Sequence, residues 1–295
     1  MFIKRLPKFE YHAPATVAET LKLMAKYRDK ASIYAGGTDL LVSMKKREKM
    51  PEHLINLKGI PDLKGIRSHG RKGITIGALT TMAELERSAV VKDRCRPLWD
   101  AVTVMASPQV RTLGTIGGNL CSAVPSADTA PPLIVLGASA RLVGPKGERS
   151  VLVEEFFTGP KESALRKNEI LTEITIPSLP EFSSGAYLKL MRRNALDLAL
   201  VGVAAFLRFD SNRKVCKSAK VALGAVAPTP IRAPEAEKAL VGKEINESVA
   251  AEAGKVASVV CHPISDVRAS LEYRCNMVEV LTKRAILEAC KRVNR

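Results

Sequence analysis

The spacing of apolar side chains changes several times along the chain, and each change predicts a new element of secondary structure. Thr16 and Glu19 have the spacing of a capping box, which indicates a helix within residues 14–28. The apolar residues of this helix share one face: Val17, Leu21, Met24 and Ala25. A buried strand over 31–35, a helix over 39–49 and a strand over 54–57 complete a small mixed unit.

The stretch between residues 58 and 177 contains more strand patterns than helix patterns. The predicted strands are 63–67, 74–79, a hairpin over 139–153 and 169–176. The predicted helices are 97–105, 130–136 and a short one capped by Thr81 and Glu84. This stretch therefore reads as a second mixed unit.

A segment rich in proline, serine and glutamate, 178–184, precedes the last part of the chain. Three strands are predicted beyond it, at 186–191, 199–209 and 219–226. Three helices follow, at 234–240, 247–260 and 270–293. Strands followed by helices indicate an α+β domain with the helices on one face of a sheet.

Charge and cysteine usage narrow the function classes. The 295 residues include 46 Lys or Arg and 30 Asp or Glu, which gives a formal net charge of +16. Aromatic residues make up only 4% and no long basic block occurs, so docking to an acidic protein partner, or simple solubility, explains the charge better than nucleic acid does. Six cysteines without C-x-x-C spacing argue against a zinc or iron–sulfur site in this chain.

No apolar run is long enough for a membrane span and the N-terminus lacks a signal-peptide pattern, so we expect a cytoplasmic location.

Two motifs with a Gly-Gly pair are the strongest candidates for ligand binding: IYAGGTDL at 33–40 and LGTIGGNLCSAVPSADTA at 113–130. Paired glycines let the backbone adopt a positive φ and approach a ligand closely, and successive N–H groups can then converge on an anion. Two such loops predict a pyrophosphate held from two sides. A structural turn is the alternative for each motif, and neither motif matches a P-loop or a Rossmann fingerprint.

AGGTDL at 35–40 and TIGGNLCSAVPSAD at 115–128 resemble the flavin-pyrophosphate motifs of the FAD-binding medium subunit of molybdenum hydroxylases, the group that includes carbon-monoxide dehydrogenase and xanthine dehydrogenase. The segments 189–204 and 271–287 resemble the C-terminal domain of the same family. The resemblance implies an α+β fold with α/β units at 1–55 and 56–177, which form an FAD-binding fold of the vanillyl-alcohol-oxidase and peptidoglycan-precursor-reductase type. It also implies a C-terminal α+β domain at 178–295, with helices on an antiparallel sheet.

The same resemblance implies that FAD lies between the first two units. Asp128 would face the ribityl chain or polar flavin atoms, and Leu171 would pack near the adenine. Lys189 would approach the pyrimidine edge of the flavin, where a cation stabilises the reduced ring. The implied cofactor-binding residues are Tyr34, Ala35, Gly36, Gly37, Thr38, Asp39, Ala106, Gly114, Thr115, Gly118, Asn119, Cys121, Ser122, Asp128, Leu171 and Lys189. We expect no catalytic side chain and no metal ligand, because His12, His53, His69 and His262 share no motif.

The function implied by the resemblance is electron transfer. A molybdopterin-binding large subunit would oxidise the substrate, a [2Fe–2S] small subunit would pass the electrons on, and the FAD here would deliver them to NAD or another acceptor. Two alternatives stay open: a stand-alone FAD-dependent reductase or oxidase, and a non-enzymatic module that binds phosphate or nucleic acid.

Overall fold

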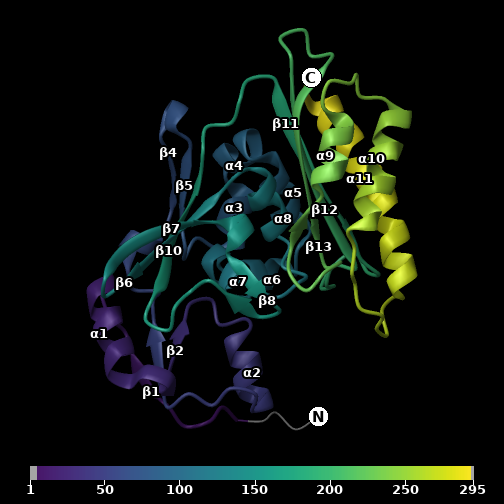
Figure 1. Cartoon of the computed structure of the whole chain (residues 1–295). Coiled ribbons are helices and arrows are strands. Elements are labelled where there is room, and N and C mark those ends of the chain that lie inside the picture. Colours follow the sequence, from purple (N-terminus) through teal and green to yellow (C-terminus); the bar gives the residue numbers. More distant parts are fainter. Residues whose placement is uncertain (1–4, 294–295) are drawn as a thin grey trace.

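The structure is a computed structural model that describes residues 5–293. Its strands form three main sheets that follow one another along the chain (Figure 1). The first sheet has the order β1-β3-β2 with parallel pairing. Its elements, which we call the first unit, are β1 (Glu10–His12), α1 (Val17–Tyr27), β2 (Ala31–Tyr34), α2 (Leu40–Lys46) and β3 (His53–Asn56).

Helix α1 begins as its sequence predicts. The Thr16 hydroxyl accepts a hydrogen bond from the backbone N–H of Glu19 at 3.1 Å, and the Glu19 carboxylate accepts one from Ala15 N–H at 2.8 Å. The buried face is rotated slightly from the predicted one, because Thr20 is fully buried whereas Ala25 is exposed. The methyl group of threonine can pack, and its hydroxyl bonds back to the carbonyl of Thr16.

The second sheet is antiparallel throughout, in the order β4-β5-β10-β6-β7. Its strands are β4 (Ile66–Ser68), β5 (Ile74–Gly77), β6 (Ser139–Gly144), β7 (Gly147–Leu152) and β10 (Ile170–Ile176), and β8 (Phe157–Gly159) pairs separately with β9 (Glu162–Ser163). The helices between β5 and β6 are α3 (Met82–Arg87), α4 (Ala89–Arg94), α5 (Arg96–Val104), α6 (Pro108–Arg111), α7 (Ile116–Ser122) and α8 (Ala130–Val135). The predicted strands at 74–79 and 169–176, the hairpin and the capping box at Thr81 are confirmed. The strand predicted at 63–67 is largely wrong, because Pro61 begins a short 3-10 helix over Pro61–Leu63 and the strand starts only at Ile66.

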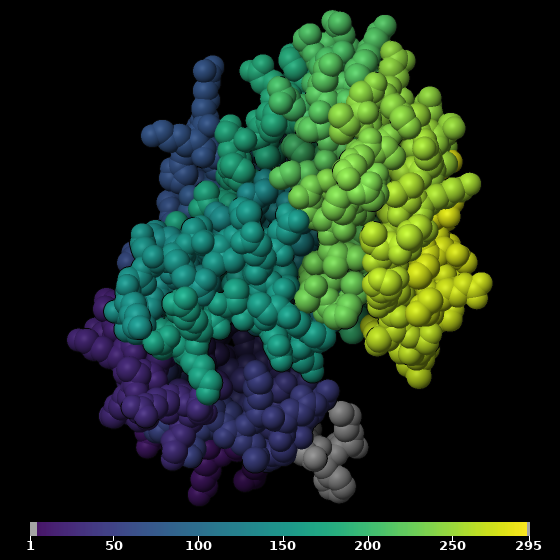
Figure 2. All heavy atoms as spheres, viewed as in Figure 1, coloured from purple at the N-terminus to yellow at the C-terminus, as the bar shows by residue number. Residues whose placement is uncertain are grey.

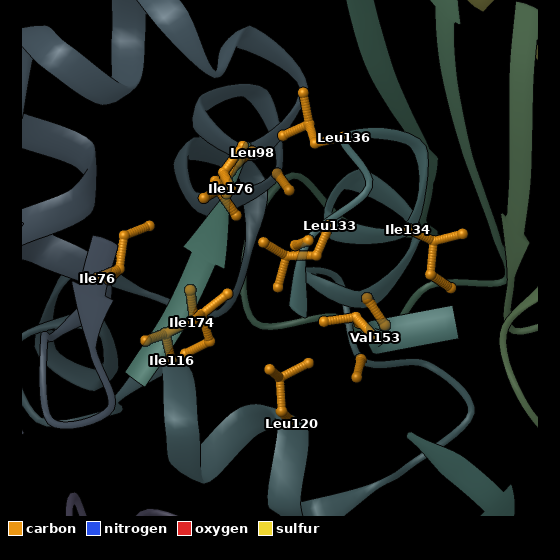
Figure 3. Close-up of a cluster of buried hydrophobic side chains, with 14 of the residues drawn as sticks. Ile76, Leu98, Ile116, Leu120, Leu133, Ile134, Leu136, Val153, Ile174 and Ile176 are labelled. Atoms are coloured by element: carbon orange, nitrogen blue, oxygen red, sulfur yellow. The ribbon is translucent and has the colours of Figure 1, made fainter. Parts of the chain in front are cut away.

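The hydrophobic core of this second unit lies between its sheet and its helices. Figure 3 shows Ile174 and Ile176 of β10 facing apolar side chains of α7 and α8. Ile116 and Leu120, four residues apart on α7, are fully buried in this cluster. Their burial turns the opposite face of α7 toward the first unit.

The third sheet is antiparallel, in the order β11-β12-β13-β14. Its elements, the third unit, are β11 (Ser183–Leu190), β12 (Val201–Phe209), β13 (Cys216–Gly224), β14 (Ile231–Arg232), α9 (Pro234–Leu240), α10 (Glu247–Val259) and α11 (Leu271–Val293). Along β12, Val203 packs toward the helices whereas Ala204 packs toward the second unit. The sheet is therefore buried on both faces, and the helices cover one of them, as predicted (Figure 1).

A joint centred on Asp100 connects the second and third units. The Asp100 carboxylate, on α5, accepts hydrogen bonds from the Tyr187 backbone N–H at 3.1 Å and from the Arg292 guanidinium at 2.5 Å. The same guanidinium donates to the Gly185 carbonyl at 2.8 Å. One buried carboxylate thus ties α5 to β11 and to the last turns of α11.

The first unit lies along one end of the second, seen as purple atoms below teal ones in Figure 2. Among the described residues, no helix is both long and apolar enough to cross a membrane.

Candidate functional site

A cavity of about 580 Å³, the main cavity, lies where the first and second units meet. The first unit contributes the segment after β2, and the second contributes α7, the start of β10 and neighbouring loops. Leu196, Asp197 and Leu198 of the third unit also line it. The cavity is therefore bounded by segments from all three units.

The first glycine motif forms a turn between β2 and α2. Gly37 has φ +78°, which a residue with a side chain rarely adopts, and a Cβ there would lie 2.4 Å from a ring carbon of Tyr34. Within residues 5–293, the backbone N–H groups of residues 36–39 donate to no protein acceptor. Four successive unpaired donors in the wall of a cavity suit anionic oxygens, as the sequence predicts.

The second glycine motif differs from its prediction, because its Gly-Gly pair lies in a helix and not in a loop. Thr115 is the N-cap of α7, and its hydroxyl accepts from Gly118 N–H at 3.1 Å. The N–H groups of Ile116 and Gly117 are also used, bonding to the carbonyls of Thr80 and Ala78. The Thr115 cap determined this helical conformation. The second motif therefore offers the cavity a helix surface, whereas the first motif offers it unpaired backbone N–H groups.

Glycine is needed here for close packing. A Cβ on Gly117 would lie 2.7 Å from the Cβ of Ala78. A Cβ on Gly118 would meet only the Thr115 hydroxyl, at 2.9 Å. Gly117 therefore lets α7 pack closely against Ala78 of the same unit. Gly118 leaves room on the side of α7 that faces the cavity.

The two motifs contact each other directly. A Cβ on Gly36 would lie 2.2 Å from the carbonyl oxygen of Leu113, so only glycine allows these backbones to approach. The Ser122 hydroxyl donates to the Asp39 carboxylate at 2.5 Å, across 83 residues of sequence. This hydrogen bond joins the end of α7 to the start of α2.

Asn119 and Cys121 present two further groups to the cavity. The buried Thr129 hydroxyl donates to Asn119 Oδ1 at 2.6 Å, which leaves the Asn119 amide hydrogens free to donate. Burial raises the pKa of the Cys121 thiol to about 12, so this thiol is protonated at neutral pH. Both groups are therefore neutral.

Asp128 is a buried carboxylate in the cavity wall. Lys189 Nζ donates to it at 2.8 Å and the Tyr187 hydroxyl at 2.8 Å. Burial raises the pKa of Asp128, while the Lys189 ammonium and the Tyr187 hydroxyl oppose that shift. The Lys189 side chain is only 1% exposed and does not line the cavity, so it lies behind Asp128.

Part of the cavity wall is apolar and includes a further carboxylate. Leu165, Ile170 and Leu171 line it. Glu169 also lines it and accepts two hydrogen bonds from Arg149, at 2.9 and 2.7 Å. The Arg149 guanidinium lowers the pKa of Glu169 to about 2, so this carboxylate is ionised.

The loop from the third unit that reaches the cavity is held by Asp197. Its carboxylate accepts from the backbone N–H groups of Arg192 and Arg193, at 2.6 and 3.2 Å. Burial alone would raise the pKa of Asp197, but these hydrogen bonds lower it overall. The loop also bonds to the second unit, through Leu196 N–H to the Ala106 carbonyl at 3.1 Å. It thereby places two half-exposed leucines, 196 and 198, beside the cavity.

Most of the predicted binding residues line the main cavity: Ala35, Gly36, Gly37, Thr38, Asp39, Ala106, Gly114, Thr115, Gly118, Asn119, Cys121, Ser122, Asp128 and Leu171. Tyr34 and Lys189 do not line it. The Tyr34 ring lies against Gly37 and its hydroxyl accepts from Lys58, so its side chain supports the turn from outside.

Sequence reasoning missed several lining residues, among them Ser32, Lys49, Arg111, Glu169, Leu196 and Leu198. Arg111 is buried, ion-paired with Glu86 at 3.0 Å, and bonded to the Met105 carbonyl at 2.8 Å. The sequence signal for Arg111 was a charged residue in the short helix that precedes the second motif. That signal was weak, because its partner Glu86 lies 25 positions away in the sequence.

Two family models cover nearly the whole chain. The FAD-binding domain in molybdopterin dehydrogenase matches residues 7–179, and the CO dehydrogenase flavoprotein C-terminal domain matches residues 186–289. The chain belongs to the FAD-binding medium subunits of the molybdenum hydroxylases. FAD is accordingly its cofactor, and the subunit is part of an oxidoreductase.

Individual relatives agree with this family. The carbon monoxide dehydrogenase medium chain of Hydrogenophaga pseudoflava is 36% identical over 286 residues, covering 97% of this chain and 98% of the relative. The xanthine dehydrogenase FAD-binding subunit of Escherichia coli O157:H7 is 32% identical, with 95% of each chain covered. A solved carbon monoxide dehydrogenase from Hydrogenophaga pseudoflava superposes with a TM-score of 0.93 at 37% identity, covering 98% of this chain and 99% of that one.

Proposed function

We propose that this subunit binds FAD in the main cavity and uses it to carry electrons from a [2Fe–2S] small subunit to NAD or another acceptor. The electrons would originate at a molybdopterin-binding large subunit that oxidises the substrate. When bound, FAD supplies two-electron redox chemistry at its ring system. The residues of this chain bind that group, orient it and set its electrostatic surroundings.

The observation that carries this proposal is the row of unpaired backbone N–H groups at residues 36–39. Such a row suits the oxygens of a pyrophosphate, and the neighbouring Thr38 hydroxyl and Asn119 amide add neutral donors. Gly118 leaves the facing helix surface free of a side chain. The fit of these groups to an anionic dinucleotide is the reason for placing FAD here.

Asp128 and Leu171 have separate roles in the proposal. Asp128 would accept a hydrogen bond from a polar group of the cofactor, and Lys189 would hold Asp128 in place from behind. This makes Lys189 a positioning residue, since Asp128 separates it from the cavity. Leu171, at the apolar wall, would pack against a ring of the cofactor.

The test compares the subunit alone with the subunit in its complex. The purified subunit should show flavin absorption and release FAD on acid treatment. In the complex, substrate of the molybdenum subunit should bleach the flavin absorption, and NAD should be tested as the agent that restores it. Rapid bleaching of the isolated subunit by a small substrate would contradict a relay role and favour a stand-alone reductase or oxidase.

A further inference from the structure

Three potential metal ligands lie together on the first sheet, and none of them lines the main cavity: Glu10, His12 and His53. Their proximity follows from strand pairing. Strands β1 and β3 are parallel, with Glu10 directly beside His53. His12 lies two residues beyond Glu10 on the same strand, and residues two apart project from the same face of a sheet.

The ligand atoms of the three side chains form a compact triangle. His12 Nε2 lies 3.2 Å from His53 Nδ1. The Glu10 carboxylate lies 3.3 Å from His53 Nδ1 and 3.8 Å from His12 Nε2. One ligand atom from each residue therefore lies within 3.8 Å of the other two.

This triangle has the size that a tetrahedral zinc site requires. With Zn–N and Zn–O bonds of about 2.0–2.1 Å, tetrahedral geometry separates neighbouring ligand atoms by about 3.3–3.4 Å. Two of the three distances lie within about 0.2 Å of that separation, and the third is longer by about half an ångström. Glu10 is 71% exposed and can adjust its position, so the longer distance can close.

The two imidazoles are held by packing. The Tyr27 ring, at the end of α1, stacks on both: its centroid lies 3.7 Å from that of His53 and 4.9 Å from that of His12. The side chains of His12 and His53 are only 19% and 12% exposed. Preorganised ligands of this kind lose little conformational entropy on binding a metal.

We propose that Glu10, His12 and His53 form a zinc site in the first unit, with a fourth position open to water. Two imidazoles and one carboxylate are a ligand set that zinc accepts. The metal would link the short edge strand β1 to the central strand β3, and so stabilise the first unit.

The test is zinc binding to the purified full-length subunit, measured by equilibrium dialysis with metal analysis. We expect about one zinc per chain. Glu10→Gln and His53→Gln should each weaken zinc binding at least about tenfold, because even partners of metal ligands change affinity by about 10–100-fold. Glu10→Gln alters an exposed side chain, so it tests the site even if His53→Gln disturbs the Tyr27 stack.

Two control variants separate this site from other binding. His262→Gln removes an exposed histidine elsewhere, and Cys121→Ser removes a thiol from the main cavity. Both should keep full zinc binding. Cobalt should give the visible absorption of a tetrahedral site without thiolate, and this absorption should vanish in Glu10→Gln. No binding by the wild-type chain at micromolar zinc, or unchanged binding in both ligand variants, would overturn the proposal.

Discussion

Replacing Gly118 by alanine separates cofactor binding from folding. Gly118 lies inside α7 without a positive φ, so alanine can adopt its backbone conformation. The added Cβ would meet only the Thr115 hydroxyl, at 2.9 Å, and would otherwise point toward the main cavity. The fold should therefore tolerate the change while the binding surface does not.

The two effects on stability nearly cancel. Alanine in place of glycine in a helix interior gains about 1 kcal/mol. Displacing the Thr115 hydroxyl weakens an N-cap bond, which costs about 0.5–2 kcal/mol. We expect the free energy of unfolding of the FAD-free protein to change by about 1 kcal/mol or less.

The effect on FAD is larger. Inserting a methyl group into a close-packed contact costs about 1–3 kcal/mol, which corresponds to roughly 5- to 150-fold in the dissociation constant. Fluorescence titration of FAD-free protein with FAD measures this constant, and urea denaturation measures stability. Gly118→Val should weaken FAD binding further than Gly118→Ala does.

The matched control is Gly59→Ala. A Cβ at Gly59 contacts only the Pro14 carbonyl, at an ordinary 3.7 Å, and this residue does not line the cavity. Its FAD affinity should equal that of the wild type. Wild-type FAD affinity in both Gly118 variants would refute the proposal that this face of α7 borders the cofactor.

Three further changes test other parts of the site. Lys189→Met should lower the free energy of unfolding by about 3–5 kcal/mol, because it leaves the buried Asp128 carboxylate without its cation, and chemical denaturation measures the loss. Glu169→Gln should destabilise the protein at pH 6 but much less at pH 3. The pKa of Glu169 is lowered to about 2 in the fold, so its stabilisation is full above its ordinary value of 4.5 and is lost as the pH falls toward 2, as urea denaturation across this range would show. Gly37→Ala should reduce FAD occupancy, read as the ratio of flavin to protein absorbance, because it strains the turn that presents the free N–H groups.

Each of these changes has its own control. Combining Lys189→Met with Asp128→Asn should restore part of the lost stability, and no restoration would mean that the lysine acts through packing alone. Gly65→Ala matches Gly37→Ala in backbone strain, since Gly65 has φ +90°, but a Cβ there meets nothing within 4 Å. An equal loss of FAD occupancy in the two glycine variants would show that backbone strain in general, and not the turn at Gly37 in particular, causes the loss. An identical pH dependence in Glu169→Gln and wild type would exclude the Arg149 pair as a source of acid sensitivity.

Much of the fold follows from local sequence signals. Caps at Thr16 and Thr81, the hairpin at 144–147 and the helices after residue 233 were predictable, because each depends on residues close together in sequence. The second glycine motif was predicted as a loop, and it is helical because Thr115 caps the turn that contains both glycines. Glycine weakens a helix without forbidding it, so the Thr115 cap can set the helical conformation, and the close approach to Ala78 requires glycine at position 117.

Reasoning from the residues themselves located the site only where they are contiguous, and Ala106 and Leu171 came from the family resemblance. The two motifs supplied most of the cavity lining, whereas Glu169 and Leu196 reach it through strand pairing and a loop from another unit. No periodicity reveals that Asp128 lies between Lys189 and the cavity, since that arrangement depends on how two units pack. The histidine pair, 41 residues apart, is likewise formed by parallel strand pairing.

The joint at Asp100 has a consequence for how the chain is made and degraded. Arg292 lies 192 positions after Asp100, so the residues of α5 leave the ribosome long before this partner is made. A protease that removed the last turn of α11 would leave the Asp100 carboxylate with Arg96, at 3.0 Å, as its one ion-pair partner among residues 5–293. A truncation at the end of α11 would therefore weaken the contact between α5 and β11. For a protein fused at this end, the stability of that buried contact is the property to measure.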